Sequence, residues 1–564
     1  MGKESMGISK TLAIIVIAAI VVVAAVVGAY WWLSLREEAP IPGVSLSVSP
    51  APTSVKDSGG YAKPGESAVV SGSTSPAVDD AEVTLTYTKP DSNITRVQLG
   101  TPLGTNFTRT TTTDKDGKFT DTYSVASTDP TGKWTVAAEI RGNTSDPATF
   151  YIFTGTPIKI GVIRNLFVQG DGMEEASILA AEDINDAGGV LGRKAILAFG
   201  DEGTEATTGV AEITRLITVE GVDFITGGFR TEIVIPMKEV AMDYKKIFII
   251  TGAATTELFN SLGSFTMPDY KDNVQGNYDR YKYMFRVMPP NSTLLFSGTL
   301  IPYLRSHLVP MLGGSETSPV KVAAVVENLA WCDLLADVYE KFFAVAFGTT
   351  MEKVREKPWR PGHTETDFSS ILTAIKDSGA GLIIHVFSGE AGLAYVKQWG
   401  EMQIPAVTIG INVLSQNSEM WDDTNGKCEY EVFISSPPRV PLTPLLIPVW
   451  DRYVEKFGHD PVYTSLGAYD AIFTLKYGVE QAGSIDSDAI VTALEGSERD
   501  TLMGRGGFTQ YHDVLIIDPY PMTVHKDWVT PLIVQWRDGQ REVLFPFERP
   551  YISEFEFPPW ITPP

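Results

Sequence analysis

The chain has 564 residues, with 45 lysines and arginines against 69 aspartates and glutamates, and a formal net charge of −24. At about 150 residues per domain, this length predicts three or four domains, each large enough for its own core. The acidic balance argues against nucleic acid as a partner, because binding to a phosphate backbone needs clustered cationic side chains. The two cysteines, Cys332 and Cys428, are too few for a disulfide framework and lack the spacing of a metal site.

An uncharged apolar run of 23 residues, 11–33, follows a short head at residues 1–10. As a helix it is long enough to cross about 30 Å of hydrocarbon, and the three aromatic residues at its end are typical of a membrane interface. A cleaved secretory signal has a shorter apolar core and a small-residue cleavage site. Two lysines precede the run and two glutamates follow it. We therefore predict a single-pass membrane anchor, with the N-terminus inside and the bulk of the chain extracellular.

The next segment predicts a spacer and a β module. Residues 34–51 are expected to form an extended Pro-rich linker. From residue 44 to about 155 the sequence consists of short alternating runs, such as the one that places Val83, Leu85 and Tyr87 on one face. No helical period separates these runs, so we predict an antiparallel β sandwich. It resembles the immunoglobulin-like modules of surface proteins, without their disulfide.

Two kinds of short motif fall in or near this module. Asp114-Lys115-Asp116-Gly117 is similar to the start of a calcium loop, but the 12-residue spacing that ends in Glu is absent, so we expect an ordinary hairpin turn. Tripeptides of the N-glycosylation type begin at Asn93, Asn106, Asn143 and Asn291. Three of the four lie in the module, which fits an exposed stalk on a glycoprotein.

Beyond residue 157, buried-type strands alternate with helical sequence. Strands are predicted at residues 158–163, 195–199, 222–227, 247–251, 322–326, 381–387 and 406–410. This order predicts an α/β fold with parallel sheets that are covered by helices on both faces. About 400 residues exceed what one sheet organises, so two lobes are expected.

Six stretches of this region occur in the order of a known family. They are AAEDINDAGGVLGRK at 180–194, YMFRV at 283–287, TDFSSIL at 366–372, GAYDA at 467–471, GRGGF at 504–508 and VQWRDG at 534–539. With these motifs, residues 158–546 resemble the type I periplasmic binding proteins of the branched-chain amino acid class, the solute receptors of ABC importers. The resemblance implies a bilobed domain over 156–564, with lobe 1 at about 156–288 and 437–525 and lobe 2 at about 289–436 and 526–564.

The same resemblance implies a function. A small polar solute, such as an amino acid, an amide or a carboxylate, would bind in the cleft and be delivered to permease and ATPase subunits. Residues 7–10 also resemble the prepilin-type signals of archaeal surface binding proteins, which are cut before the hydrophobic run. The sequence leaves open whether the head is cut. A surface filament that self-assembles through this helix is the alternative function, and a receptor that controls another protein is a third.

Motifs for catalysis are absent from the sequence. The six histidines are scattered, and the chain has no HExxH, GxSxG or P-loop spacing. We therefore expect a protein that is not an enzyme and that uses no cofactor or metal.

The candidate ligand residues of lobe 1 follow from the position of its strands. Ligand sites in such sheets lie beyond the carboxyl ends of the strands. In amino-acid binders of this family, the loops at these points bind a carboxylate with backbone N–H groups and hydroxyls, and a helix N-terminus favours the anion. The matching residues are Phe229, Arg230, Thr231, Ala253, Ala254 and Thr255. Arg230 is either a charged hydrogen-bond donor to the solute or a solvated arginine on the rim.

The candidates of lobe 2 are Glu327, Trp331, Phe387 and Asn412. Trp331 and Phe387 are either apolar walls of the site or core residues. Amino-acid binders commonly have an acidic residue near position 412 for the ammonium group, whereas this chain has an amide. Either Glu327 or Glu390 substitutes for it, or the solute is an amide, a carboxylate without an amine or another small polar solute.

The two cysteines are expected in lobe 2. The sequence leaves open whether Cys332 and Cys428 form a disulfide, which the environment outside the cell permits, or remain small buried hydrophobic residues.

Overall fold

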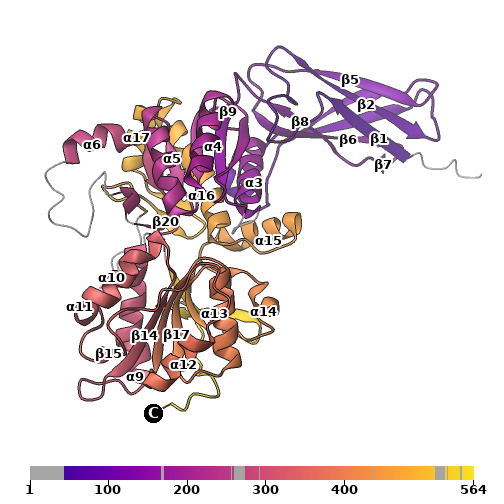
Figure 1. Ribbon diagram of the computed structural model, residues 1–564. Coiled ribbons are helices and arrows are strands. Elements are labelled where there is room, and N and C mark those ends of the chain that lie inside the picture. Colours follow the sequence, from indigo (N-terminus) through magenta and orange to yellow (C-terminus); the bar gives the residue numbers. More distant parts are fainter. Residues whose placement is uncertain are drawn as a thin grey trace, which may run out of the picture.

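The computed structural model describes residues 43–166, 171–255, 257–259, 274–290, 292–435, 437–514, 528–529, 531–546 and 549–563. The predicted anchor at 11–33 and the sequon at Asn291 lie outside these residues. Among the residues that are described, no helix has the length and apolar character to cross a membrane. Figure 1 shows an N-terminal β module beside the upper of two α/β lobes, with the second lobe below.

The β module consists of two antiparallel sheets. One has the order β1-β2-β5 and the other β4-β3-β6-β7, with β8 also paired to β6. Their bounds are β1 Gly43–Ser49, β2 Ser67–Ser75, β3 Glu82–Thr88, β4 Asn106–Thr112, β5 Lys118–Ser124, β6 Gly132–Ile140, β7 Asn143–Thr144 and β8 Ala148–Ile152, with the short helix α2 at Ile94–Gln98. Residues from both sheets, including Val70, Leu85 and Trp134, share one buried apolar cluster.

The structure decides two points about this module. Residues 43–49 form β1 and pair with β2, because the alternating Val44, Leu46 and Val48 pack against the module core. Residues 44–49, which lie in both the expected linker and the expected module, therefore belong to the module. The Asp116-Gly117 turn does not close a hairpin, since it joins β4 to β5, which lie in different sheets. Asp114 Oδ1 accepts hydrogen bonds from the backbone N–H groups of Asp116 and Lys118, each at 2.9 Å, and these bonds shape the turn.

Lobe 1 contains a five-stranded parallel sheet in the order β10-β9-β11-β12-β13. The strands are β9 Ile158–Arg164, β10 Ala195–Asp201, β11 Phe224–Gly227, β12 Phe248–Ile250 and β13 Met284–Arg286. Its helices are α3 Gly172–Asp186, α4 Ala206–Thr218, α5 Thr231–Asp243, α6 Val274–Tyr281, α15 Leu446–Phe457, α16 Tyr463–Ala482 and α17 Ser487–Glu495, with the hairpin β19 Arg499–Thr501 and β20 Gly504–Gly506. Ile160 of β9 and Leu466 of α16 belong to the same core, so a late segment completes the lobe.

Lobe 2 contains a seven-stranded sheet in the order β15-β14-β16-β17-β18-β21-β22. It is parallel from β15 to β18, and β21 is antiparallel to both of its neighbours. The strands are β14 Val320–Val326, β15 Met351–Lys353, β16 Leu382–Phe387, β17 Val407–Asn412, β18 Val432–Ser435, β21 Leu532–Arg537 and β22 Gln540–Phe545. The longer helices are α10 Asp333–Lys341, α12 Ser369–Ser378 and α13 Glu390–Glu401. The two-lobed α/β fold predicted from the sequence is thus confirmed.

The C-terminal segment packs on lobe 2. Trp560 Nε1 donates a hydrogen bond of 2.9 Å to the carbonyl of Ile404, and Gln535 Nε2 donates one of 2.8 Å to the carbonyl of Glu556. The chain crosses between the lobes after β13, after β18 and again between β20 and β21.

The two faces of the lobe 2 sheet have separate cores. Val322 and Ala324 of β14 belong to one buried cluster, and Ala323 and Val325 belong to the other. Cys332 lies in the first cluster and Cys428 in the second, and both are free thiols. The disulfide considered from the sequence is therefore not formed, because the sheet separates the two residues although they share a lobe.

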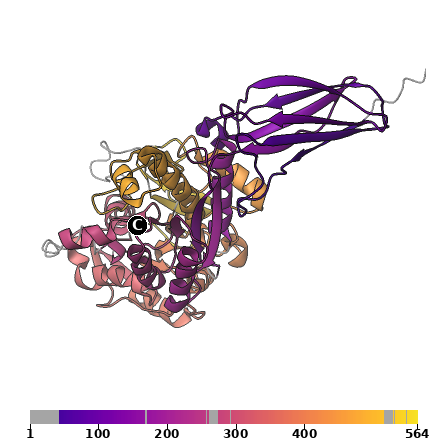
Figure 2. The ribbon, with the colours of Figure 1, turned by 90° about the horizontal axis from the view of Figure 1, so that it is seen from above.

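The β module is fixed to lobe 1 by residues 53–59. The backbone N–H of Leu197, on the edge strand β10, donates a hydrogen bond of 2.8 Å to the carbonyl of Val55. The buried ammonium group of Lys194 donates to Thr53 Oγ1 at 3.1 Å and to the carbonyls of Ser54, Asp57 and Gly59 at 3.3, 2.8 and 2.8 Å. Figure 2 shows the module projecting from this lobe.

Candidate functional site

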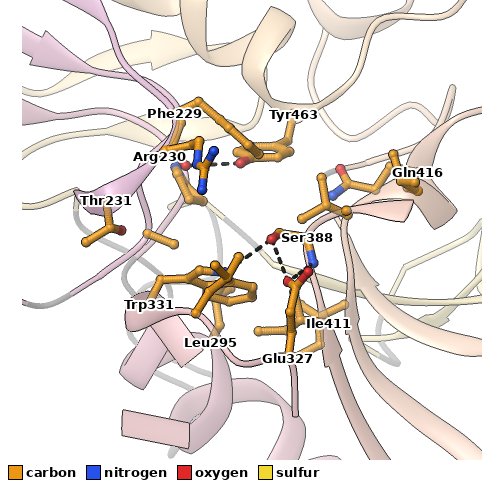
Figure 3. Close-up of a pocket in the computed structure, with 18 of the residues that line it drawn as sticks. Phe229, Arg230, Thr231, Leu295, Glu327, Trp331, Ser388, Ile411, Gln416 and Tyr463 are labelled. Carbon is orange, nitrogen blue, oxygen red and sulfur yellow. Dashed lines mark hydrogen bonds between the residues drawn. The ribbon is translucent and has the colours of Figure 1, made fainter. Parts of the chain in front are cut away.

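A cavity of about 380 Å³ lies between the two lobes, and both contribute to its lining. Figure 3 shows Arg230, Thr231 and Tyr463 of lobe 1 on one side of it and Glu327, Trp331 and Ser388 of lobe 2 on the other. The cavity thus lies beyond the carboxyl ends of the central strands β11, β14 and β16, where open α/β sheets bind their ligands.

The wall from lobe 1 is built around the start of α5. Gly227 and Gly228 have φ angles of +109° and +83°, and a Cβ on Gly227 would lie 1.9 Å from the carbonyl oxygen of Ile163. Only glycine allows the chain to leave β11 in this way. Thr231, the first residue of α5, is buried and lines the cavity.

A buried carboxylate of the protein lies behind this wall. Glu202 Oε2 accepts a hydrogen bond from the backbone N–H of Phe229, and Oε1 accepts one from that of Arg230, both at 2.9 Å. Asn165 Nδ2 donates a third, also at 2.9 Å. Burial raises the pKa of Glu202 to about 7 in spite of these three donors. Glu202 therefore satisfies the two N–H groups that precede α5 and fixes the loop in place.

Arg230 matches neither of the two interpretations of the sequence fully. Its Nε and Nη2 atoms lie 2.8 and 2.6 Å from Glu232 Oε1, and its side chain is 16% exposed. The guanidinium lines the cavity while Glu232 neutralises it. Reaching a solute would require Arg230 to exchange or share this carboxylate.

The loop after β12 forms the rest of the wall from lobe 1. Ala254 lines the cavity, whereas Ala253 and Thr255 are buried outside the lining. Their carbonyls accept hydrogen bonds of 3.0 and 2.9 Å from Nη1 of Arg286, a fully buried side chain. Asp513 holds Arg286 through two oxygen–nitrogen contacts of 2.7 and 2.6 Å. A buried ion pair thus supports this loop from behind.

The wall from lobe 2 contains a carboxylate with one free oxygen. Glu327 is completely buried just past β14. Its Oε2 accepts hydrogen bonds from the N–H and the hydroxyl of Ser388, at 2.8 and 2.7 Å, whereas no described residue forms a hydrogen bond with Oε1. Trp331 Nε1 donates to Ser388 Oγ at 3.3 Å, so the indole, the hydroxyl and the carboxylate form one chain of hydrogen bonds (Figure 3).

Apolar side chains make up much of the remaining lining. Leu295, Ile411 and the ring of Trp331 lie around the carboxylate in Figure 3, and Phe229 faces them from lobe 1. Mostly apolar walls with a few convergent polar groups are typical of sites for small molecules. The described residues contain no cluster of His, Cys, Asp and Glu suited to a metal ion.

Residues 157–527, about two thirds of the chain, match the periplasmic binding protein family. The chain belongs to this family. Periplasmic binding proteins bind solutes and are not enzymes, so the cavity between the lobes is the expected place for a solute.

This binding protein is 25% identical over 364 residues to the Leu/Ile/Val-binding protein homolog 3 of Brucella melitensis. The matched region covers 63% of this chain and 88% of that protein. Its structure is similar to that of the branched-chain amino acid transporter substrate binding protein LivJ from Streptococcus pneumoniae in complex with isoleucine. The TM-score is 0.55 at 18% identity, over 69% of this chain and 100% of LivJ.

A second similar structure is that of a solute binding protein of an ABC transporter from R. palustris in complex with benzoate. It has a TM-score of 0.54 at 13% identity and covers 69% of this binding protein and 95% of the other chain. At these identities the two structures show the fold that is shared.

Six of the ten residues expected from the sequence to bind solute line the cavity. They are Phe229, Arg230, Thr231, Ala254, Glu327 and Trp331. Ala253, Thr255, Phe387 and Asn412 lie outside the lining. Phe387 packs in the core of lobe 2 against Phe368 and Tyr395, with ring centroids 5.8 and 5.0 Å apart. Asn412 is completely buried, and its amide donates a hydrogen bond of 3.0 Å to Glu431 Oε1.

Sequence reasoning missed several residues of the lining, including Leu295, Ser388, Ile411, Gln416 and Tyr463. Ser388 follows the predicted strand 381–387 directly, so its position alone was a usable signal. Tyr463 begins α16 and donates a hydrogen bond of 3.0 Å to the carbonyl of Gly252. Nothing near Tyr463 in the sequence marks it, because it reaches the site from an element that follows a lobe crossing.

Proposed function

We propose that the protein captures a small solute between its two lobes, outside the cell, and delivers it to the permease and ATPase subunits of an ABC importer. The observation that carries this proposal is the cavity lined by polar groups from both lobes, with Thr231 on one side and Glu327 on the other. Only a closed arrangement contacts a solute from both sides, so binding shifts the protein towards closure. Membership of the periplasmic binding protein family supports this function.

The proposed solute is an amino acid, an amide or a carboxylate with an apolar part. The Leu/Ile/Val-binding relative and the isoleucine complex support an amino acid, and the benzoate complex supports a carboxylate without an amine. A carboxylate would lie at Thr231, where the N-terminus of the 13-residue helix α5 favours an anion. Leu295, Ile411 and Trp331 would contact the apolar part.

The arrangement of the whole chain is also a proposal. Residues 11–33 would anchor the protein in the membrane after a head at 1–10, and the module at 44–155 would be an immunoglobulin-like spacer. The solute-binding domain would span 156–564, with the lobe boundaries given above. Glycans would attach to the exposed Asn93 and Asn106 and the half-exposed Asn143, and the bulk of the chain would be extracellular.

A thermal-shift screen of the full chain in detergent, over amino acids, amides and carboxylates, tests the proposal, with calorimetry on each compound that raises the melting temperature. We expect at least one compound to bind with one-to-one stoichiometry. If that compound has a carboxylate, Thr231→Val should weaken its binding. A screen without any binding solute would contradict solute capture. A filament that self-assembles through residues 11–33 makes no use of the cavity, so solute binding separates the two functions.

A further inference from the structure

We infer that Glu327, rather than the residue at position 412, binds the amino group of the solute, and that the solute is an amine-bearing compound with an apolar body. This inference rests on the proposed function, because it assigns a role within the same cavity.

The first observation is the free oxygen of Glu327. The side chain is completely buried, and Oε1 has no hydrogen-bond partner among the residues that the structure describes, although Oε2 accepts two. An unpaired carboxylate oxygen away from water is unfavourable, and an ammonium group that donates to it relieves this cost. Oε1 lies 3.6 Å from the position that a Cβ on Gly389 would occupy, and Gly389 itself lines the cavity. The free oxygen thus lies directly behind the part of the cavity wall that Gly389 forms.

The second observation is that the carboxylate is held in one orientation. Ser388 donates to Oε2 through both its N–H and its hydroxyl, and the same hydroxyl accepts from Trp331 Nε1. Oε2 is thereby directed towards the start of α13, which leaves Oε1 as the oxygen available to a ligand. A group fixed before binding loses little further freedom when the solute arrives.

The third observation is that the amide nitrogen of Asn412 is already engaged. Its Nδ2 lies 3.0 Å from Glu431 Oε1 and 3.4 Å from the carbonyl of Gly392, and the side chain is completely buried outside the cavity lining. Glu431, whose other oxygen accepts a hydrogen bond of 2.6 Å from Ser415, is buried as well. Neither side chain lines the cavity. Neither can therefore contact the ammonium group of a solute, as the acidic residue of amino-acid binders does.

The charges around Glu327 fit a cationic partner. Burial raises the pKa of Glu327 and outweighs the hydrogen bonds from Ser388 and the charges of His363 and Arg230, which lower it. An ammonium group beside Oε1 would favour the charged carboxylate. Arg230, on the opposite lobe, is neutralised by Glu232, so it leaves the free oxygen to the solute. A solute with an ammonium group at Glu327 and an apolar body against Leu295 and Ile411 uses all of these features.

The experiment compares amine-bearing compounds with their deaminated analogues. Calorimetry measures the binding of leucine against 4-methylpentanoate, and of phenylalanine against 3-phenylpropanoate, to the full wild-type chain and to Glu327→Gln. We expect the wild type to prefer the amine of a pair. The affinity of Glu327→Gln for that amine should fall by about 10- to 150-fold, the factor that a charged hydrogen bond supplies, and its affinity for the analogue should stay within about threefold.

Two further variants make the result specific. Glu390→Gln separates the two carboxylates, because loss of the amine preference in this variant but not in Glu327→Gln would overturn the inference. Ser388→Ala removes one of the two donors that orient Glu327, and it should reduce the amine preference by less than Glu327→Gln does. If Glu327→Gln does not fold, Ser388→Ala provides the second measurement.

Equal affinity of the wild type and Glu327→Gln for an amine, or a wild type that prefers the deaminated acid, would overturn the inference while solute capture stands. Binding of neither member of either pair would overturn the assignment to amines with an aliphatic or aromatic body. A complete absence of binding in the wider screen is the separate result that rejects solute capture itself.

Discussion

Asn412 Nδ2 lies 3.0 Å from Glu431 Oε1, and both side chains are completely buried in lobe 2. His385, also completely buried, places its Nε2 3.4 Å from the same oxygen, and its Nδ1 lies 3.0 Å from Thr408 Oγ1. Burial raises the pKa of Glu431 to about 8 and lowers that of His385 to about 3. At neutral pH this network therefore consists of uncharged groups, which are less costly to bury than ions.

The uncharged state of Glu431 predicts how substitutions act on stability. Glu431→Gln replaces a protonated carboxyl by an amide of the same shape, so we expect a loss of less than about 1 kcal/mol at pH 7. Asn412→Ala removes a donor from a buried acceptor and should cost about 1–3 kcal/mol. Urea unfolding of both variants measures the difference, and the reverse order would show that Glu431 is ionised in the folded protein.

The stability should also depend on pH. The pKa of Glu431 is about 8, and those of Glu202 and Asp470 are about 7, because each is buried. Between the ordinary carboxyl range and these values, the folded protein keeps protons that the unfolded chain has released. The free energy of unfolding should therefore fall as pH rises from about 5, by about 1.4 kcal/mol per pH unit for each group until its own pKa is reached, at about 7 for Glu202 and Asp470 and about 8 for Glu431.

His385 acts in the opposite direction. Its lowered pKa leaves it neutral in the folded protein, so stability is lost as pH falls below about 6.5, where the unfolded chain takes up the proton.

Urea unfolding at pH 5.5, 7 and 8.5 tests the role of Glu431. Above neutrality, the free energy of unfolding should decrease less steeply with pH for Glu431→Gln than for the wild type. The same pH dependence in both proteins would contradict the assignment.

Lys194 offers a test of how the β module is held. Lys194→Met removes the donor for three backbone carbonyls and one hydroxyl of residues 53–59, and it should lower stability by about 1–3 kcal/mol. Limited proteolysis should then cleave this segment faster, with solute affinity unchanged. Lys56→Met is the matched control, because the Lys56 side chain is 51% exposed and its ion pair with Glu174 is worth at most about 1 kcal/mol. Equal protease sensitivity of both variants would contradict the role of Lys194.

Arg230 and Glu232 form a pair that can be dissected. If Arg230 reaches the solute, Arg230→Ala should weaken the binding of a carboxylate by about 1.5–3 kcal/mol, as for a charged hydrogen bond. Glu232→Gln frees the guanidinium and should leave that affinity equal or higher. Calorimetry on both variants gives the answer, and unchanged binding by Arg230→Ala would remove this residue from the site.

The two thiols should be inert in the folded protein. Both are completely buried, and burial raises the pKa of Cys428 to about 12 and that of Cys332 well above its usual range. Alkylation without reductant should label neither cysteine in the native state and both after denaturation. Cysteines that stay unlabelled in the denatured protein until a reductant is added would indicate a disulfide after all.

The strands of the two lobes could be predicted from sequence because their runs of apolar residues are short and bounded. The expected strand at 158–163 is β9, Ile158–Arg164, and the expected strand at 381–387 is β16, Leu382–Phe387. The partners of single side chains could not be predicted. Asn412 ends a strand at the expected edge, but its direction is set by Glu431, a residue 19 positions later that directly precedes the neighbouring strand β18.

The same limit applies to Phe387 and Tyr463. The face on which the last residue of a strand lies decides whether it is core or lining, and Phe387 lies on the face that packs against α12 and α13. Tyr463 contacts the loop after β12 across more than two hundred residues of sequence. Contacts of this range depend on how the lobes assemble, which the local pattern of residues does not encode.

The attachment of the β module to lobe 1, together with the packing of the C-terminal segment on lobe 2, places the two ends of the described chain on different lobes. A rotation between the lobes would change the separation of these ends, and the β module places the N-terminal end further from lobe 2. A fluorophore pair at Ser45 and Ile561 would then convert solute capture into a change in energy transfer. Energy transfer between these two labels would therefore measure solute binding directly.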